Sequence, residues 1–189
     1  MHTYKTPAAT QAGTKRLELL ARLGVGLHAR CIQQATGKPI SGWAVVPSTR
    51  SPGAHPLLHA VVLPAIRTMA PPGEPHAEIS LGPGAEFRRT PRELVPGMWK
   101  INPGANPAEH HVLLIDDTWT TGGNAQSAAV ALRSAGASAV TILTLARWLD
   151  RSRELVPEFI MGRLAHRNLD LFHCPALTSG CPQPREASR

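Results

Sequence analysis

Apolar residues recur along the chain with two different spacings. Short apolar runs flanked by polar or turn-forming residues are typical of buried strands, whereas apolar residues three or four apart are typical of helices. Such segments alternate along the chain, which predicts an α/β fold with a central, mostly parallel sheet flanked by helices. The strands are predicted at 43–46, 77–81, 112–115 and 139–146, and the helices at 14–31, 55–68, 125–135 and 151–170.

Glycine and proline predict where these elements end. Gly24 and Gly26 lie inside the first predicted helix and are expected to bend or break it. Thr36-Gly37-Lys38-Pro39 predicts the end of that helix, and Gly136 predicts the end of the third. We expect a disordered N-terminus over 1–13, one domain over 14–170 with a loop-rich segment at about 82–110, and an irregular C-terminal tail over 171–189.

The candidate chemistry lies in residues 111–124. Four apolar residues run directly into Asp116 and Asp117, a turn rich in hydroxyls and glycine follows, and a helix then begins. Helix N-termini and successive backbone amides attract phosphate. The two carboxylates can accept hydrogen bonds from hydroxyls of the same ligand. A ligand that carries a phosphate at one end and a diol at the other is a phosphorylated sugar.

This stretch resembles the phosphoribosyl pyrophosphate (PRPP) motif of the type I phosphoribosyltransferases, in which a hydrophobic strand precedes two acidic residues, two variable residues and Thr-Thr-Gly. The resemblance extends over residues 40–150. It implies the type I phosphoribosyltransferase fold with a flexible hood at 82–110. It also implies a glycosyltransferase of the pentosyltransferase type, acting in nucleotide metabolism, that transfers phosphoribose from Mg-PRPP to a small nitrogen-containing acceptor and releases pyrophosphate.

The resemblance assigns a role to each candidate site residue. Asp116 and Asp117 would hold the ribose hydroxyls and stabilise a cationic ribosyl centre, and Arg50 completes the catalytic candidates. Mg²⁺ is expected mainly on the substrate, with no metal site made of protein ligands alone. The 5-phosphate would be bound by Thr118, Thr120, Thr121, Gly122, Gly123 and Asn124, the pyrophosphate by Ser48, Thr49 and Arg50, and the acceptor by Arg147, Trp148 and Asp150.

Several positions depart from the family pattern. Asn124 stands where Thr or Ser is frequent, and Trp119 replaces a smaller aliphatic residue, either to stack on a ligand or to fill a gap in the core. Thr120 stands where the 6-oxopurine enzymes carry an acidic group, which argues against hypoxanthine-guanine salvage. Residues 92–101 resemble the hood of the competence protein F group of phosphoribosyltransferases.

The formal net charge of +7 allows two kinds of anionic partner. With one Tyr and three Phe, the basic residues are not interleaved with aromatics, which favours an anionic small molecule over nucleic acid. Two alternatives to an enzyme stay open: a non-catalytic PRPP-binding regulatory protein, and an accessory factor in DNA uptake like competence protein F. The sequence leaves the oligomeric state open, a homodimer included.

The sequence also predicts the compartment of the protein and the state of its cysteines. No apolar run reaches the roughly 18 residues of a membrane span, and the polar N-terminus lacks a signal-peptide core, so we expect a cytoplasmic protein. Three cysteines argue against a disulfide framework. His173, Cys174 and Cys181, with Cys31 upstream, could hold zinc, but no C-x-x-C pair is present and incidental or buried thiols are the favoured interpretation.

Overall fold

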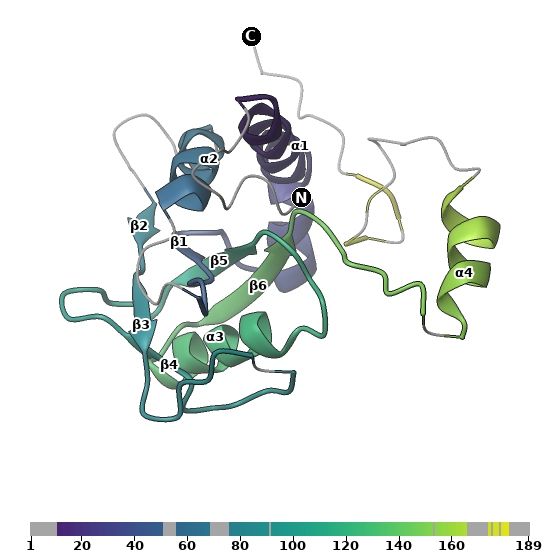
Figure 1. Ribbon diagram of the computed structural model, residues 1–189. Coiled ribbons are helices and arrows are strands. Elements are labelled where there is room, and N and C mark those ends of the chain that lie inside the picture. The colour runs from purple at the N-terminus through teal and green to yellow at the C-terminus, as the bar shows by residue number, and fades with distance from the viewer. Residues whose placement is uncertain are drawn as a thin grey trace, which may run out of the picture.

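A four-stranded parallel sheet forms the centre of the molecule (Figure 1). The computed structural model describes residues 11–50, 56–68, 76–90, 92–152, 154–165, 174, 176–177 and 179–181. All six residues of β5 (His111–Asp116) are buried, as is typical of a central parallel strand covered on both faces. The predicted α/β fold with a parallel sheet is confirmed. The strand order is β2-β1-β5-β6, with β1 at Gly42–Val45, β2 at Ala77–Glu78, β5 at His111–Asp116 and β6 at Ala139–Thr144.

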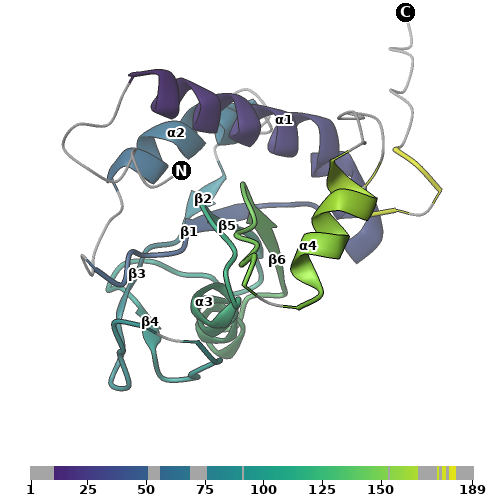
Figure 2. The same ribbon diagram turned by 45° about the vertical axis from the view of Figure 1, so that its right-hand side comes forward.

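Alternate residues of β5 face two separate hydrophobic layers. Leu113 and Ile115 pack into the layer formed by α1 (Gln11–Thr36) and α2 (Pro56–Arg67). Val112 and Leu114 pack into the opposite layer, which contains α3 (Gly123–Ser134). Figures 1 and 2 show α1 and α2 side by side on one face and α3 on the other. The period of two along the strand thus produces a three-layer arrangement.

The segment predicted as a hood contains an ordered antiparallel pair. Strands β3 (Leu81–Pro83) and β4 (Trp99–Ile101) pair in the register Leu81↔Ile101, and β4 lies beside α3. Met98 and Trp99 are almost fully buried in the layer around α3. The base of the hood is therefore anchored in the core, and movement of the rest stays a prediction.

The predicted break in the first helix is wrong. α1 runs without interruption from Gln11 to Thr36, so that residues 11–13, predicted to be disordered, are helical. A Cβ atom on Gly24 would lie 3.5 Å from the side chain of Leu143 in β6, an ordinary contact distance, so Gly24 lies against the sheet. The predicted stop is confirmed, because Gly37 adopts a φ of 68° directly after the helix.

Other predicted boundaries shift. The strand predicted at 77–81 is two strands in different sheets, because β2 pairs with β1 and β3 pairs with β4. The helix predicted at 151–170 is a short α4 (Val156–Phe159) followed by a π-helical turn at Ile160–Leu164. Neither contains a buried residue, so the predicted apolar packing face is absent over the described part of that segment. Residues 1–10, 166–170 and most of the tail lie outside the described residues.

Among the described helices, none combines the length and the apolar character that a bilayer span needs.

Alanine substitutions test the continuity of α1. Gly24→Ala and Gly26→Ala should each raise the free energy of unfolding by about 0.5–1 kcal/mol, because alanine loses less backbone entropy inside a helix. The Gly24 Cβ would meet Leu143 at an ordinary distance, and the Gly26 Cβ would meet nothing within 4 Å. Urea denaturation measures the change. Gly37→Ala is the control and should destabilise, since its φ is 68°. Destabilisation by the first two variants would mean that the helix is bent there.

Candidate active site

A cavity of about 660 Å³ opens at the carboxyl edge of the parallel sheet. Its size lies within the range of about 300–1,000 Å³ that small-molecule sites occupy, and this edge is the ligand side of open α/β sheets. The loops after β1, β5 and β6 converge there because the three strands are parallel neighbours. The cavity is lined by residues 46–50, Leu58, Arg89, Thr90, Arg92, Asp116, Asp117, Thr118, Thr120, Thr121, Gly122, Asn124, Ala125, residues 147–150 and Val156.

Two buried carboxylates form one wall of the cavity. Asp116 is the last residue of β5, Asp117 follows it, and their exposed fractions are 8% and 5%. The backbone carbonyl of Asp116 accepts a hydrogen bond from Leu145 N–H at 3.0 Å, which fixes the strand end beside β6. Burying a carboxylate is costly, so an adjacent buried pair at a cavity wall is typical of a functional site.

The turn that follows delivers backbone amides to the same cavity. Gly122 is the N-cap of α3 with a φ of 86°, and a Cβ atom there would overlap the Trp119 indole ring, so only glycine fits. The first-turn amides of a helix have no intrahelical acceptor, and the first turn of α3 contains no acidic residue that would repel an anion. With the hydroxyls of Thr118, Thr120 and Thr121 in the lining, the turn can hold a phosphate.

Gly123 differs from the other residues predicted to bind phosphate, since it does not line the cavity. A Cβ atom on Gly123 would lie 2.5 Å from the carbonyl oxygen of Glu93. Its place is therefore under the hood, where the absence of a side chain lets the backbone of the hood approach α3.

Trp119 links two of the converging loops. The backbone N–H of Trp119 donates to the carbonyl of Ala146 at 2.8 Å, and the backbone carbonyl of Trp119 accepts from the backbone N–H of Trp148 at 2.8 Å. The side chain packs against the layer around α3 and does not line the cavity. Of the two roles considered from the sequence, filling a gap in the core agrees with this geometry.

Asn124 joins the helix N-terminus to two other segments. Its Nδ2 donates to the carbonyl of Pro47 at 3.3 Å, and its Oδ1 accepts a 2.9 Å hydrogen bond from Trp99 Nε1. Pro47 begins the loop predicted to bind pyrophosphate, and Trp99 anchors the hood. The side-chain amide, expected to donate to phosphate, is thus used to hold the walls of the cavity together, which leaves the backbone N–H of Asn124 for an anion.

The remaining predicted residues come from the loops after β1 and β6. The hydroxyl of Ser48 accepts a hydrogen bond from Arg50 N–H at 3.3 Å, so the loop turns on itself. On the opposite side, Asp150 Oδ1 accepts from the backbone N–H and hydroxyl of Ser152 at 3.0 and 2.7 Å, which orients the carboxylate. Ser48, Thr49, Arg50, Arg147, Trp148 and Asp150 all line the cavity, as does every other predicted site residue except Gly123.

The sequence missed several lining residues. Arg89, Thr90 and Arg92 of the hood face the cavity, as do Leu58 of α2 and Val156 of α4. The hood contains four basic residues, of which Arg89 and Arg92 line the cavity and Arg88 and Lys100 do not. The spacing of these residues in the sequence gives no signal that distinguishes the first pair from the second.

The chain has structural similarity to solved phosphoribosyltransferases. A hypoxanthine phosphoribosyltransferase from Staphylococcus aureus matches at 16% identity and a TM-score of 0.40, over 71% of this chain and 64% of the other. Two structures of the Trypanosoma cruzi hypoxanthine phosphoribosyltransferase match at 10% and 12% identity with TM-scores of 0.47 and 0.45, over 71% and 80% of this chain and 78% and 93% of theirs. No protein-family model and no curated protein matches the chain. At these identities and TM-scores, the function has to be inferred from the cavity itself.

The donors at the cavity fit a substrate-borne Mg²⁺. The carboxylates of Asp116 and Asp117 and the hydroxyl of Thr118 are oxygen donors, which Mg²⁺ prefers, and Mg²⁺ commonly binds through one or two carboxylates together with substrate phosphates. No histidine or cysteine lines the cavity among the described residues.

The cysteines, expected to be incidental or buried thiols, lie together away from this cavity. Cys31 and Cys174 are buried, Cys181 is partly buried, and none of the three forms a disulfide. Burial, with hydrogen bonds to Cys174 and Cys181, raises the pKa of the Cys31 thiol to about 12. His173 lies outside the described residues, and the histidine that joins the cluster is His28 of α1.

Removing the Asn124 side chain tests its bridging role. Asn124→Ala should lower the free energy of unfolding by about 1–3 kcal/mol, because two hydrogen bonds are lost and the buried Trp99 N–H loses its acceptor. Gln126→Ala, an exposed position two residues further along α3, is the matched control and should change stability by less than about 0.5 kcal/mol. Chemical denaturation of both variants gives the comparison. If both variants lose the same stability, Asn124 does not hold the walls of the cavity together.

Proposed function

We propose that this protein is a type I phosphoribosyltransferase that transfers the phosphoribosyl group of Mg-PRPP to a nitrogen acceptor and releases pyrophosphate. The supporting observation is the convergence, on one cavity, of a buried acid pair, an amide-lined turn at a helix N-terminus and a hydroxyl-rich loop with a fixed positive charge. Such a protein would be a glycosyltransferase of the pentosyltransferase type, acting in nucleotide metabolism.

The order of the groups around the cavity corresponds to the order of the parts of PRPP. The turn 118–124 would hold the 5-phosphate, and the preceding Asp116 and Asp117 would accept hydrogen bonds from the ribose hydroxyls. The loop of Ser48, Thr49 and Arg50 would hold the pyrophosphate. It follows β1, which is paired with β5 from Gly42↔Val112 to Val45↔Ile115, so the loop lies next to the acid pair.

The reaction breaks the bond between C1 of ribose and a pyrophosphate oxygen and forms a bond between C1 and the acceptor nitrogen, which loses a proton. Positive charge develops on the ribose ring, and the buried carboxylates of Asp116 and Asp117 would stabilise it. Arg50 would neutralise the charge of the departing pyrophosphate. Mg²⁺, when bound with PRPP, supplies further charge neutralisation at the phosphate oxygens. Fixing the phosphate and the ribose in one cavity positions C1 for attack.

The acceptor would bind between the sugar and the loop after β6. Trp148 is 55% exposed and lines the cavity, so its indole face could stack on a planar nitrogen heterocycle. Arg147 and Asp150 supply one group of each charge for hydrogen bonds to ring substituents. Thr120, in place of an acidic residue, argues against hypoxanthine or guanine as the acceptor.

Two alternatives have different experimental signatures. A non-catalytic PRPP-binding regulatory protein would bind Mg-PRPP but release no pyrophosphate with any acceptor, and Arg89 and Arg92 in the cavity wall favour catalysis over that role. A competence protein F-like accessory factor in DNA uptake, suggested by residues 92–101, would bind DNA with a steep salt dependence. A cytoplasmic location stays a prediction from the sequence, and the oligomeric state stays open, a homodimer included.

Calorimetry with Mg-PRPP tests donor binding. Wild type should bind, and Asp116→Asn/Asp117→Asn should bind at least about 10-fold more weakly, because hydrogen bonds to charged groups contribute about 1.5–3 kcal/mol each. Glu109→Gln, an exposed carboxylate outside the cavity, should bind like wild type. If wild type shows no heat of binding, or if the double variant binds equally well, donor binding at this acid pair is refuted.

Pyrophosphate release, measured with Mg-PRPP and a panel of nitrogen bases and ammonia, tests the hood. Arg89→Ala and Arg92→Ala should each lower kcat/KM by about 10–100-fold, the loss expected when one charge-assisted hydrogen bond is removed. Arg88→Ala and Lys100→Ala are matched controls from the same segment that do not line the cavity, and both should keep kcat/KM near the wild-type value. Equal losses in all four variants would indicate a general charge effect and contradict a specific role of the two arginines.

A further inference from the structure

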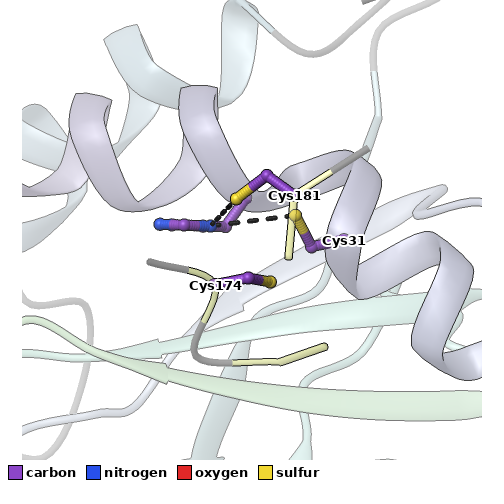
Figure 3. Close-up of side chains that lie close together, drawn as sticks. Cys31, Cys174 and Cys181 are labelled. Carbon is purple, nitrogen blue, oxygen red and sulfur yellow. Dashed lines mark hydrogen bonds between the residues drawn. The ribbon is translucent and has the colours of Figure 1, made fainter. Parts of the chain in front are cut away.

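Four side chains with metal-binding atoms gather away from the candidate active site. His28 and Cys31 come from α1, and Cys174 and Cys181 come from the C-terminal segment. Their ligand atoms all lie within 4.8 Å of one another. Figure 3 shows the three cysteines converging from these two parts of the chain.

The distances within the cluster agree with a tetrahedral metal site. His28 Nδ1 lies 3.8 Å from Cys31 Sγ and 3.7 Å from Cys181 Sγ. Around tetrahedral zinc, with Zn–S near 2.3 Å and Zn–N near 2.0–2.1 Å, neighbouring sulfur and nitrogen ligands are roughly 3.6 Å apart and two sulfurs roughly 3.8 Å apart. A small inward movement of the side chains would therefore complete the coordination.

The local structure places each ligand for this purpose. His28 and Cys31 are three residues apart on α1 and so share one helix face. The sulfur of Cys174 accepts a hydrogen bond from Leu177 N–H at 3.2 Å, the kind of outer contact that orients a metal ligand. Gly180, with a φ of 86°, turns the chain immediately before Cys181.

We propose that His28, Cys31, Cys174 and Cys181 form a structural zinc site. Three sulfurs and one imidazole nitrogen match the Cys₃His set of structural zinc centres, and four protein ligands leave no open position for catalysis. Thiolate ligands select zinc over Mg²⁺ or Ca²⁺. A disulfide would use two of the cysteines and leave the third thiol beside it, whereas zinc uses all four groups.

The site would attach the C-terminal segment to the helix that covers the sheet. α1 packs against α2 and reaches β6. The chain that leaves β6 passes through the acceptor-side residues 147–150 and α4 before it reaches Cys174. Zinc would thus anchor the far end of the segment that contributes the acceptor side of the cavity.

Metal analysis of the 189-residue chain, purified from zinc-supplemented medium without PRPP, tests the site. Wild type should contain one equivalent of zinc per chain by mass spectrometry. Cys174→Ser, Cys181→Ser and His28→Ala should retain far less, whereas His28→Cys should keep the metal because cysteine is also a zinc ligand. His59→Ala, a histidine of α2 outside the cluster, is the control and should contain as much zinc as wild type.

Cobalt substitution of the wild-type protein gives a result that does not depend on folding of the variants. Co²⁺ added to protein stripped with a chelator should produce the visible bands of tetrahedral cobalt and a near-ultraviolet thiolate-to-cobalt band. Zn²⁺ should then abolish both and restore the Tm that chelation lowers. Wild type without stoichiometric zinc and without this spectrum, or a native disulfide among the three cysteines, would overturn the proposal. Because no PRPP is present, its failure is independent of the proposed transferase function.

Discussion

The parallel pairing of β5 with β1 on one side and β6 on the other determines where the candidate site residues lie. The pairing of β1 with β5 begins at Gly42↔Val112, and the pairing of β5 with β6 ends at Asp116↔Thr144. The carboxyl ends of the three strands therefore reach the same edge of the sheet. A slip by one residue would exchange the two faces of β5, so that Leu113 and Ile115 would leave the layer of α1 and α2 and enter the layer around α3. Burial of β5 on both faces is thus what places the acid pair and the flanking loops around one cavity.

The walls of this cavity are also linked to each other. Asn124 connects the first turn of α3 to Pro47 after β1 and to Trp99 of the hood, and Trp119 connects the turn after β5 to the loop after β6. A displacement of one wall is therefore transmitted to the next. Such coupling suits a site that has to align two charged ends of one ligand around a reacting carbon, since alignment depends on relative positions of the walls.

The sequence predicted the alternating fold, and every predicted site residue except Gly123 lines the cavity, because short apolar strands and the pattern of residues 111–124 are local signals. The sequence-based prediction failed where contacts between residues far apart in the sequence determine the structure. Gly24 is helical because α1 rests on Leu143, and residues 77–81 divide because two different strands offer partners. His28 was missed although the spacing His28-x-x-Cys31 was visible, since only the fold brings Cys174 and Cys181 to that helix face.

A crystal structure of the protein with Mg-PRPP is the most direct test of the central claim. We expect the 5-phosphate against the amides of residues 120–124, the ribose hydroxyls within hydrogen-bond distance of Asp116 and Asp117, and the pyrophosphate beside Ser48, Thr49 and Arg50. A PRPP molecule bound elsewhere, or bound in this cavity with its ribose hydroxyls turned away from both carboxylates, would contradict the proposed function.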